Sequence, residues 1–212
     1  MTNYSVQELI DTLNNCKLSN SEREETIESI EIKLGDDVRG IDKSIAPLIE
    51  DLNKNNFTTI ACCSGLISDH YNIEKLTENN ITLDKIVDVQ YNTDKDIIPT
   101  PWIRLEPIYH SYSESRYIVD EKYYELKRTI HESYYGVGDY DCTAAWKLYS
   151  TDRNTEFLYH IGLIKPYFWF NRNASFKEYD DILRESIKRL HINLKYFMEN
   201  EKCPPGIEYN NR

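Results

Sequence analysis

The chain has no long apolar run. No stretch of its 212 residues approaches the roughly 20 consecutive apolar residues of a membrane span. The first residues, Met1-Thr2-Asn3-Tyr4, lack the basic segment and apolar run of a secretory signal. We therefore expect a protein that neither crosses a membrane nor carries a signal peptide.

Paired cysteines and clustered histidines are also missing. No two of the five cysteines have CxxC spacing, and the five histidines form no HxH or HExxH motif. The cysteines are Cys16, Cys62, Cys63, Cys142 and Cys203. These absences argue against a zinc ribbon, any other metal site and a disulfide framework. Reduced thiols indicate a cytoplasmic protein.

Positive charge is scarce. Lys and Arg number 25 against 36 Asp and Glu, so the net charge is −11. This balance disfavours broad binding to nucleic acid, tRNA included, because phosphate contacts need clustered Lys and Arg. It leaves room for a local basic pocket. The chain is 40% hydrophobic, which at this length is enough to build a core without a metal or a disulfide.

Apolar periodicity predicts helices at both ends of the chain. Val6, Leu9, Ile10 and Leu13 have helical spacing. Ser21 and Glu24 have the spacing of a capping box. They would open a helix that buries Ile27, Ile30 and Leu34 and ends at Gly35.

A third helix would start near Ser44 with Pro47 in its first turn, and a fourth would cover 119–134. Ser175 and Glu178 predict a capping box for a last helix, whose stripe is Tyr179, Ile182, Leu183, Ile187, Leu190, Leu194 and Phe197.

Short segments rich in β-forming residues predict a sheet. They are 57–63, 85–91, 101–106, 142–149, 156–161 and 167–171. In 101–106, Trp102 and Arg104 should face away from Ile103 and Leu105. We expect one α+β domain over 1–202, with a mixed sheet packed by helices and an N-terminal helical layer over 1–35. The polar segment 203–212 should be a disordered tail.

The segment from Arg39 to His70 carries the chemistry. A helix leads into a buried strand that ends in two thiols and a hydroxyl, Cys62-Cys63-Ser64, just before Gly65. Gly65 permits an unusual backbone conformation or the close approach of a ligand. Strand ends of this kind often bind ligands in open sheets, and free backbone N–H groups around Ser64 and Gly65 would suit an anion such as a cofactor carboxylate.

Several motifs of this segment resemble a known family. They are Gly40-Ile41-Asp42, the spaced Ile45, Ile49, Leu52 and Asn53, then Thr59 and Cys62-Cys63-Ser64-Gly65-Leu66-Ile67-Ser68. This pattern resembles the tRNA wybutosine-synthesis methyltransferases of the third pathway step. It also resembles small bacterial and phage proteins with Cys-Cys-Ser-Gly-His and a later strand, here Trp102-Ile103-Arg104-Leu105. The resemblance implies an S-adenosylmethionine-dependent N-methyltransferase acting on a tricyclic guanosine of tRNA, with Asp42 and Cys63-Ser64-Gly65 in the site.

One position departs from that pattern. Leu66 stands where the family has Arg and the small relatives have His. Since Leu can neither bind an anion nor move a proton, Arg104 or His70 would have to supply that group. Asp42 would take a proton or bind the cofactor, and Trp102 would stack on a base. A nucleophilic Cys63 would need a basic partner, for which His70 is the candidate nearby in sequence.

Three functions therefore stay open. The first is a divergent wybutosine-type methyltransferase. The second is a non-catalytic protein that binds a nucleotide or modified base, for instance one that sequesters a nucleotide signal for a virus or mobile element. The third is a protein-interaction module that uses the half containing 12 of the 17 tyrosines, Tyr109 to Tyr179. Structural roles compete at each site residue: Asp42 as a helix cap, Cys62 and Cys63 as buried small side chains, and Ser64-Gly65 as a plain turn.

Overall fold

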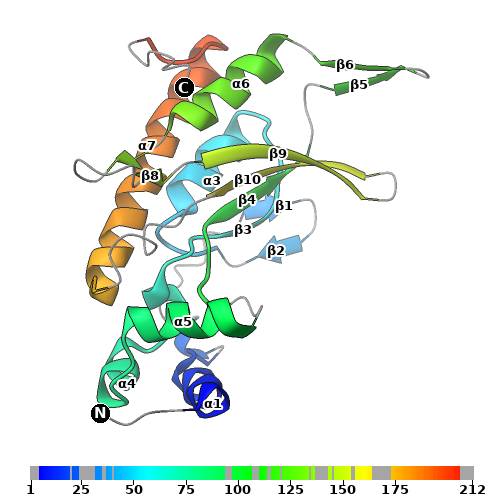
Figure 1. Cartoon of the computed structure of the whole chain (residues 1–212). Helices are drawn as coiled ribbons and strands as arrows, with labels where there is room; N and C mark the ends of the chain where they lie inside the picture. The colour runs from blue at the N-terminus through cyan, green and yellow to red at the C-terminus, as the bar shows by residue number, and fades with distance from the viewer. Residues whose placement is uncertain are drawn as a thin grey trace.

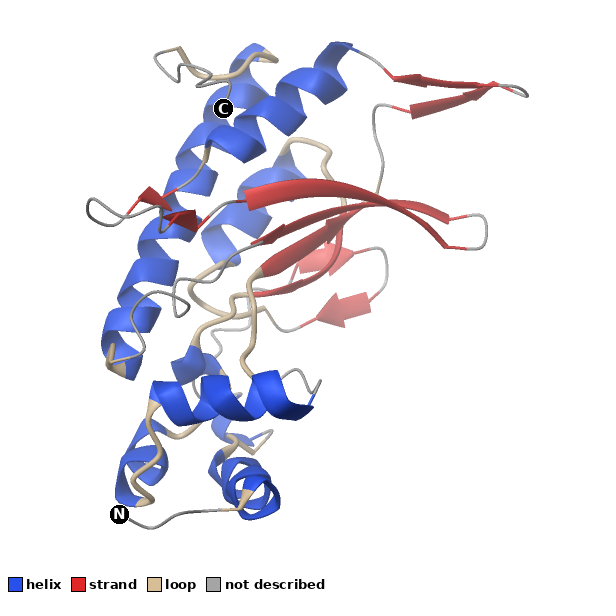
Figure 2. Ribbon diagram, in the orientation of Figure 1, coloured by secondary structure: helices blue, strands red, loops and turns tan. Residues whose placement is uncertain are grey.

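Helices pack against an antiparallel sheet, so the predicted α+β class is confirmed (Figure 2). The computed structural model describes residues 5–19, 21–23, 32–34, 37–39, 41–93, 97–106, 110–113, 116–119, 121–133, 135–136, 143–144, 146–153, 156–163 and 173–205. The helices are α1 (Val6–Cys16), α3 (Ala46–Lys54), the 3₁₀ helix η1 (Ile67–Asp69), α4 (Ile73–Glu78), α5 (Leu83–Thr93), α6 (Glu121–Glu132) and α7 (Phe176–Asn200). The strands are β1 (Ile32–Leu34), β2 (Asp37–Arg39), β3 (Thr59–Cys63), β4 (Trp102–Leu105), β5 (His110–Ser113), β6 (Arg116–Val119), β7 (Tyr135–Gly136), β8 (Thr143–Ala144), β9 (Trp146–Arg153) and β10 (Glu156–Leu163).

The central sheet has four strands in the order β3-β4-β10-β9 (Figure 1). All three strand pairs are antiparallel, whereas the sequence led us to expect a mixed sheet. Strands β9 and β10 form a hairpin, which is antiparallel by construction. Between β3 and β4 the chain passes through η1, α4 and α5 and returns in the opposite direction.

Helices cover one face of this sheet. Ile103, Leu105, Ile161 and Leu148 are buried on it, and α3, α6 and α7 lie along the same side (Figure 1). The buried indole of Trp146 donates a hydrogen bond of 2.9 Å to Ser186 Oγ on α7, so its polar atom is satisfied inside the core. Trp102 and Arg104 alternate with the buried residues of β4 and are only partly buried, as predicted.

Helix α7 forms as its sequence predicts. The Ser175 hydroxyl accepts a hydrogen bond from Glu178 N–H, and the Glu178 carboxylate accepts one from the Ser175 N–H. Of the predicted stripe all but Ile182 are fully buried, and Ile182 is partly buried. The helix ends at Asn200. Its C-cap is Glu201, which has a left-handed backbone (φ 54°) and whose N–H donates to Phe197 O. After it, Cys203 N–H donates to Glu125 Oε2, while 206–212 of the predicted tail lie outside the described residues.

Among its described residues, the N-terminal layer contains helix α1 and the helical residues 21–23, but also strand β1. Helix α1 is confirmed and carries a capping box of Ser5 and Glu8. The second capping box involves Ser19 and Glu22, two residues earlier than we predicted. The helix predicted to bury Ile27, Ile30 and Leu34 falls largely outside the described residues, but at Leu34 the prediction is wrong because Leu34 belongs to strand β1.

Three further element predictions need correction. The helix predicted over 119–134 is α6, which spans Glu121–Glu132, and Val119 belongs to strand β6. Segment 85–91 belongs to helix α5 and not to a strand. Leu83, Ile86 and Val87 are buried, and their spacing is helical although the residues from 85 on also alternate. Helix α3 begins at Ala46, slightly later than expected, with Pro47 in its first turn as predicted. The predicted strand 167–171 lies outside the described residues.

The predicted absence of a membrane span agrees with the described helices. None of them combines the length and the apolar character that crossing a bilayer requires.

Candidate functional site

A tight turn at Gly65 follows β3 and packs against Pro101, the residue before β4. Gly65 has φ +73°, a conformation that side chains disfavour, and this confirms the first of the two roles predicted for it. A Cβ at Gly65 would lie 2.3 Å from both Cδ and N of Pro101. The space beside this glycine is therefore filled by the chain's own backbone and not by a ligand.

The backbone N–H groups of this turn are already occupied. Ser64 N–H donates to Asp42 Oδ2 at 2.8 Å, and Leu66 N–H donates to Ser64 Oγ at 3.3 Å. Ile67 and Ser68 donate to the two oxygens of Asp180 at 2.7 and 3.0 Å. The predicted anion site around Ser64 is thus filled by carboxylates of the protein itself, which leaves little donor capacity for a cofactor carboxylate.

Asp42 is positioned by this turn and not by helix capping. The N-cap of α3 is Ile45, which makes no side-chain cap bond, so the predicted cap role of the Asp42 side chain is wrong. Instead the Asp42 side chain, only 7% exposed, accepts the Ser64 N–H, and Arg23 Nη2 lies 3.9 Å from its Oδ1. The Asp42 backbone carbonyl accepts from Ile45 and Ala46. Asp42 therefore joins the segment before α3 to the end of β3.

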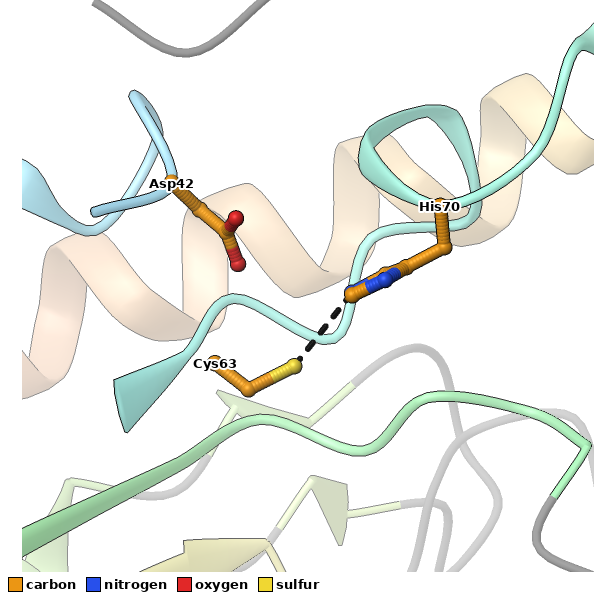
Figure 3. A group of neighbouring side chains, drawn as sticks. All are labelled: Asp42, Cys63 and His70. Carbon is orange, nitrogen blue, oxygen red and sulfur yellow. Dashed lines mark hydrogen bonds between the residues drawn. The ribbon is translucent and has the colours of Figure 1, made fainter. Parts of the chain in front are cut away.

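Cys63 and His70 meet beside Asp42. Cys63 Sγ lies 3.3 Å from His70 Nε2, because η1 turns the chain back toward the end of β3 (Figure 3). One ligand atom from each of Asp42, Cys63 and His70 lies within 4.8 Å of the others. Figure 3 shows the three side chains pointing toward one another from three separate segments. The structure thus brings together the acid, the thiol and the imidazole that the sequence singled out.

The electrostatics of this pair favour neutral groups. Burial raises the pKa of the Cys63 thiol to about 11, and the charges of Asp42 and Asp69 act in the same direction against the Gly65 backbone and Arg23. Burial also lowers the pKa of His70, with Arg23 acting in the same direction and Asp42 opposing it. Near pH 7 the protein without a ligand therefore holds a thiol beside a neutral imidazole, and not the thiolate of an activated nucleophile.

Cys62 has a different environment from Cys63. It lies opposite Ile103 in the β3–β4 register and packs against the hydrophobic core. Burial raises the pKa of Cys62 to about 12, with the charge of Asp42 acting in the same direction. These features fit the structural role that the sequence left open for Cys62.

Trp102 and Arg104 form a second part of the site. The Arg104 guanidinium carbon lies 5.5 Å from the centre of the Trp102 ring, within the range of a cation–π contact. Trp102 is the register partner of Cys63 across β3 and β4, and opposed side chains of an antiparallel pair lie about 4.5–5.5 Å apart at Cβ. A stacked aromatic ring and cation therefore adjoin the Cys63–His70 pair at one end of the sheet.

Leu66 occupies a core position. Its side chain is fully buried, so the position at which the chain departs from the resembling pattern belongs to the core. Of the two residues expected to supply the missing group, His70 contacts Cys63 and Arg104 stacks on Trp102.

Sequence analysis missed the role of Asp180. We attributed no site role to it, yet it is 5% exposed and binds two N–H groups of the η1 segment. One feature of the sequence could have revealed this role. Asp180 lies four residues after Phe176 and three before Leu183, so an acid falls within the apolar stripe. Asp69 was missed as well; its Oδ2 accepts hydrogen bonds from Ser64 and Ser44.

Comparison of the chain with protein-family models, with curated proteins and with solved structures finds no match. The resemblance to the wybutosine-synthesis methyltransferases therefore stays a prediction that depends on residues 39–70 and on the strand Trp102–Leu105.

Proposed function

We propose that this protein binds a nucleotide or a modified base without chemically converting it. One observation carries the proposal: a partly exposed tryptophan with a guanidinium stacked on it lies directly opposite Cys63, which is paired with His70. An aromatic face, a cation and a polar edge at one place are what recognition of a nucleotide needs.

Each group has a defined task in this proposal. The Trp102 ring offers a stacking surface worth about 1–3 kcal/mol per base. Arg104 pairs with phosphate oxygens or with a base edge through its fork of N–H donors. The Cys63–His70 pair offers one weak donor and one exchangeable donor or acceptor to the rim of the base.

Two features favour binding over catalysis. The thiol and the imidazole are both neutral near pH 7, and the N–H groups around Ser64 are bonded to carboxylates of the protein. The net charge of −11 favours a single nucleotide over a long RNA, because a polyanion would be repelled over most of the surface.

Calorimetric titration with a panel of purine and pyrimidine mononucleotides, dinucleotides and a tricyclic guanosine tests this proposal. We expect one site that binds at least one member, with affinity reduced about 10–100-fold by Trp102→Leu, as loss of a stacked base implies. Tyr124→Leu is the matched control, because Tyr124 is a 60% exposed aromatic residue on α6. Absence of heat with every member, or equal affinity of the wild type and Trp102→Leu, would refute the proposal.

A divergent wybutosine-type methyltransferase is the second candidate. It is favoured by the Ser64–Asp42 hydrogen bond, which joins the two sequence motifs that carry the resemblance. In that reaction a ring nitrogen of the tRNA base takes the methyl group from the sulfonium of S-adenosylmethionine, S-adenosylhomocysteine leaves, and the nitrogen's proton passes to solvent or to Asp42. Such transfer depends mainly on positioning.

Radiolabelled S-adenosylmethionine distinguishes the two candidates. Transfer of label to tRNA that carries the tricyclic precursor, lost in Asp42→Ala, would support the methyltransferase and overturn the non-catalytic proposal. No heat on titration with S-adenosylmethionine at high protein concentration would remove the methyltransferase and leave the nucleotide binder to its own test.

A further inference from the structure

The cluster of Asp42, Cys63 and His70 has the composition of a metal site. Its candidate ligand atoms are a carboxylate oxygen, a sulfur and an imidazole nitrogen, all within 4.8 Å of one another. Zinc is bound in proteins by these three kinds of atom. Softer thiolate ligands also disfavour Mg²⁺ and Ca²⁺, which prefer oxygen. We propose that Asp42, Cys63 and His70 bind a zinc ion.

The distance between the thiol and the imidazole fits a tetrahedral ion. The sulfur and nitrogen ligands of tetrahedral zinc lie about 3.5 Å apart when the bonds are about 2.3 Å and 2.0–2.1 Å long. Cys63 Sγ and His70 Nε2 are 3.3 Å apart, so only small side-chain rotations would be needed to place both on one ion. Figure 3 shows the Asp42 carboxylate directed toward the same point.

The surroundings support the ligands and attract a cation. The Ser64 N–H holds Asp42 Oδ2 at 2.8 Å, which fixes the carboxylate as outer hydrogen bonds fix metal ligands elsewhere. Three carboxylates, Asp42, Asp69 and Asp180, and one guanidinium, Arg23, act on the His70 ring, so the local charge is negative. A divalent cation would offset this charge, and its binding would displace the thiol proton of Cys63.

Three protein ligands leave a fourth position on the ion. Zinc sites with this ligand number take a water or an exchangeable ligand there, whereas four protein ligands are typical of structural zinc. The ligands lie at positions 42, 63 and 70, which match no sequence motif for zinc, and for this reason the sequence led us to expect no metal.

Metal content and cobalt substitution test the site. We expect about one zinc per chain by mass spectrometry after the full-length protein is incubated with Zn²⁺ and filtered, as one such cluster among the described residues implies. With Co²⁺ we expect a thiolate-to-cobalt charge-transfer band. Cys63→Ser should abolish that band, and His70→Gln should weaken Zn²⁺ affinity by about 100-fold or more, at least as much as loss of an outer-shell partner.

Cys62→Ser is the matched control, because this neighbouring thiol packs against the core. It should keep both the cobalt band and the zinc. Circular dichroism identifies a variant that has not folded, and the partly exposed His70 supplies a second ligand variant. Zinc bound at less than about a tenth of a mole per chain, or an unchanged cobalt band in Cys63→Ser, would overturn the proposal. Equal loss in Cys62→Ser and Cys63→Ser would overturn it too.

The zinc proposal and the nucleotide proposal fail separately. With zinc bound, Cys63 and His70 are its ligands, so the contacts to the nucleotide are those of Trp102 and Arg104. Trp102 is not a metal ligand, so Trp102→Leu should lose nucleotide and keep zinc. A protein that binds zinc but no nucleotide would contradict only the proposed function, and the reverse result would contradict only the zinc site.

Discussion

Gly65 serves the packing of the chain and not the approach of a ligand. The sequence allowed either a special backbone conformation or a ligand close to the glycine. A Cβ there would meet Pro101 at 2.3 Å, and the backbone is left-handed (φ +73°). Gly65 is therefore required for packing of the chain on itself.

We predict that Gly65→Ala lowers the free energy of unfolding by about 2–5 kcal/mol. About 1–2 kcal/mol comes from the left-handed backbone and about 1–3 kcal/mol from overpacking against Pro101. Denaturant unfolding measures the effect. Asn56→Ala is the control, because Asn56 is exposed with φ 66° and has only the backbone cost. Equal losses of unfolding free energy in Gly65→Ala and Asn56→Ala would contradict the predicted overpacking against Pro101.

The sequence patterns showed which residues form the site, but they did not show which of these residues are in contact. Cys63, Ser64 and Asp42 stood out because thiol, hydroxyl and acid flanked a helix–strand unit, and they do lie together. The Cys63–His70 contact depends on η1, a single short turn that periodicity cannot reveal. Asp180 contacts residues 112 and 113 positions away, which local pattern does not encode.

At the scale of elements, α7 anchors η1. Asp180 lies in the first turns of α7 and accepts the N–H groups of Ile67 and Ser68, and Arg184 Nη2 reaches Ser68 Oγ at 3.3 Å. The turn that carries His70 is therefore fixed by a helix more than 100 residues later in the sequence.

We predict that Asp180→Ala destabilises the protein by about 2–4 kcal/mol, because the buried N–H of Ile67 and the partly buried N–H of Ser68 lose a charged acceptor. Burial raises the pKa of Asp180, so part of the gross interaction is offset by desolvation. Thermal and urea unfolding measure the loss. Asp181→Ala is the matched control, since Asp181 is an exposed neighbour. A change below about 0.5 kcal/mol in Asp180→Ala, the size of an ordinary surface effect, would contradict this anchor.

The last helix was predicted well because capping and periodicity both indicate it. In α7, a capping box and a long apolar stripe indicate the same helix. In α5, residues 85–91 alternate like a strand, but the helical spacing of Leu83, Ile86 and Val87 over a longer window proved decisive. A short alternating segment is compatible with both periods, so tertiary packing selects between them.

At the scale of the whole molecule, the strand order β3-β4-β10-β9 was beyond sequence analysis. The hairpin β9–β10 is local, but β10 pairs with β4, which lies about 50 residues earlier along the chain. Such pairing depends on how the helices α6 and α7 cover the sheet, and no local motif fixes it.

The stability of the whole chain should depend on pH through His131. Burial lowers the pKa of His131, and Lys127 and Lys147 act in the same direction. The unfolded chain, with an imidazole pKa of about 6.5, then binds a proton that the folded chain resists. The stabilising contribution is present above about pH 6.5 and is lost as the pH falls toward the lower folded pKa.

We predict that His131→Gln reduces the fall in unfolding free energy between about pH 7 and pH 5. Urea unfolding of the wild type and the variant at several pH values measures the difference. His191→Gln serves as the control, because His191 is paired with Asp51 at 2.7 Å. A steeper fall in unfolding free energy for His131→Gln than for the wild type would contradict a lowered pKa of His131.

Indole NMR of ¹⁵N-tryptophan-labelled protein tests the central claim most directly. The chain has three tryptophans, which Trp→Phe variants assign. On titration with the best-binding nucleotide of the panel, the Trp102 Nε1–H signal should shift in a saturable manner. The signal of Trp146, which is buried and bonded to Ser186, should stay in place. An unmoved Trp102 signal at saturating nucleotide, or an equal shift of Trp146, would contradict the account.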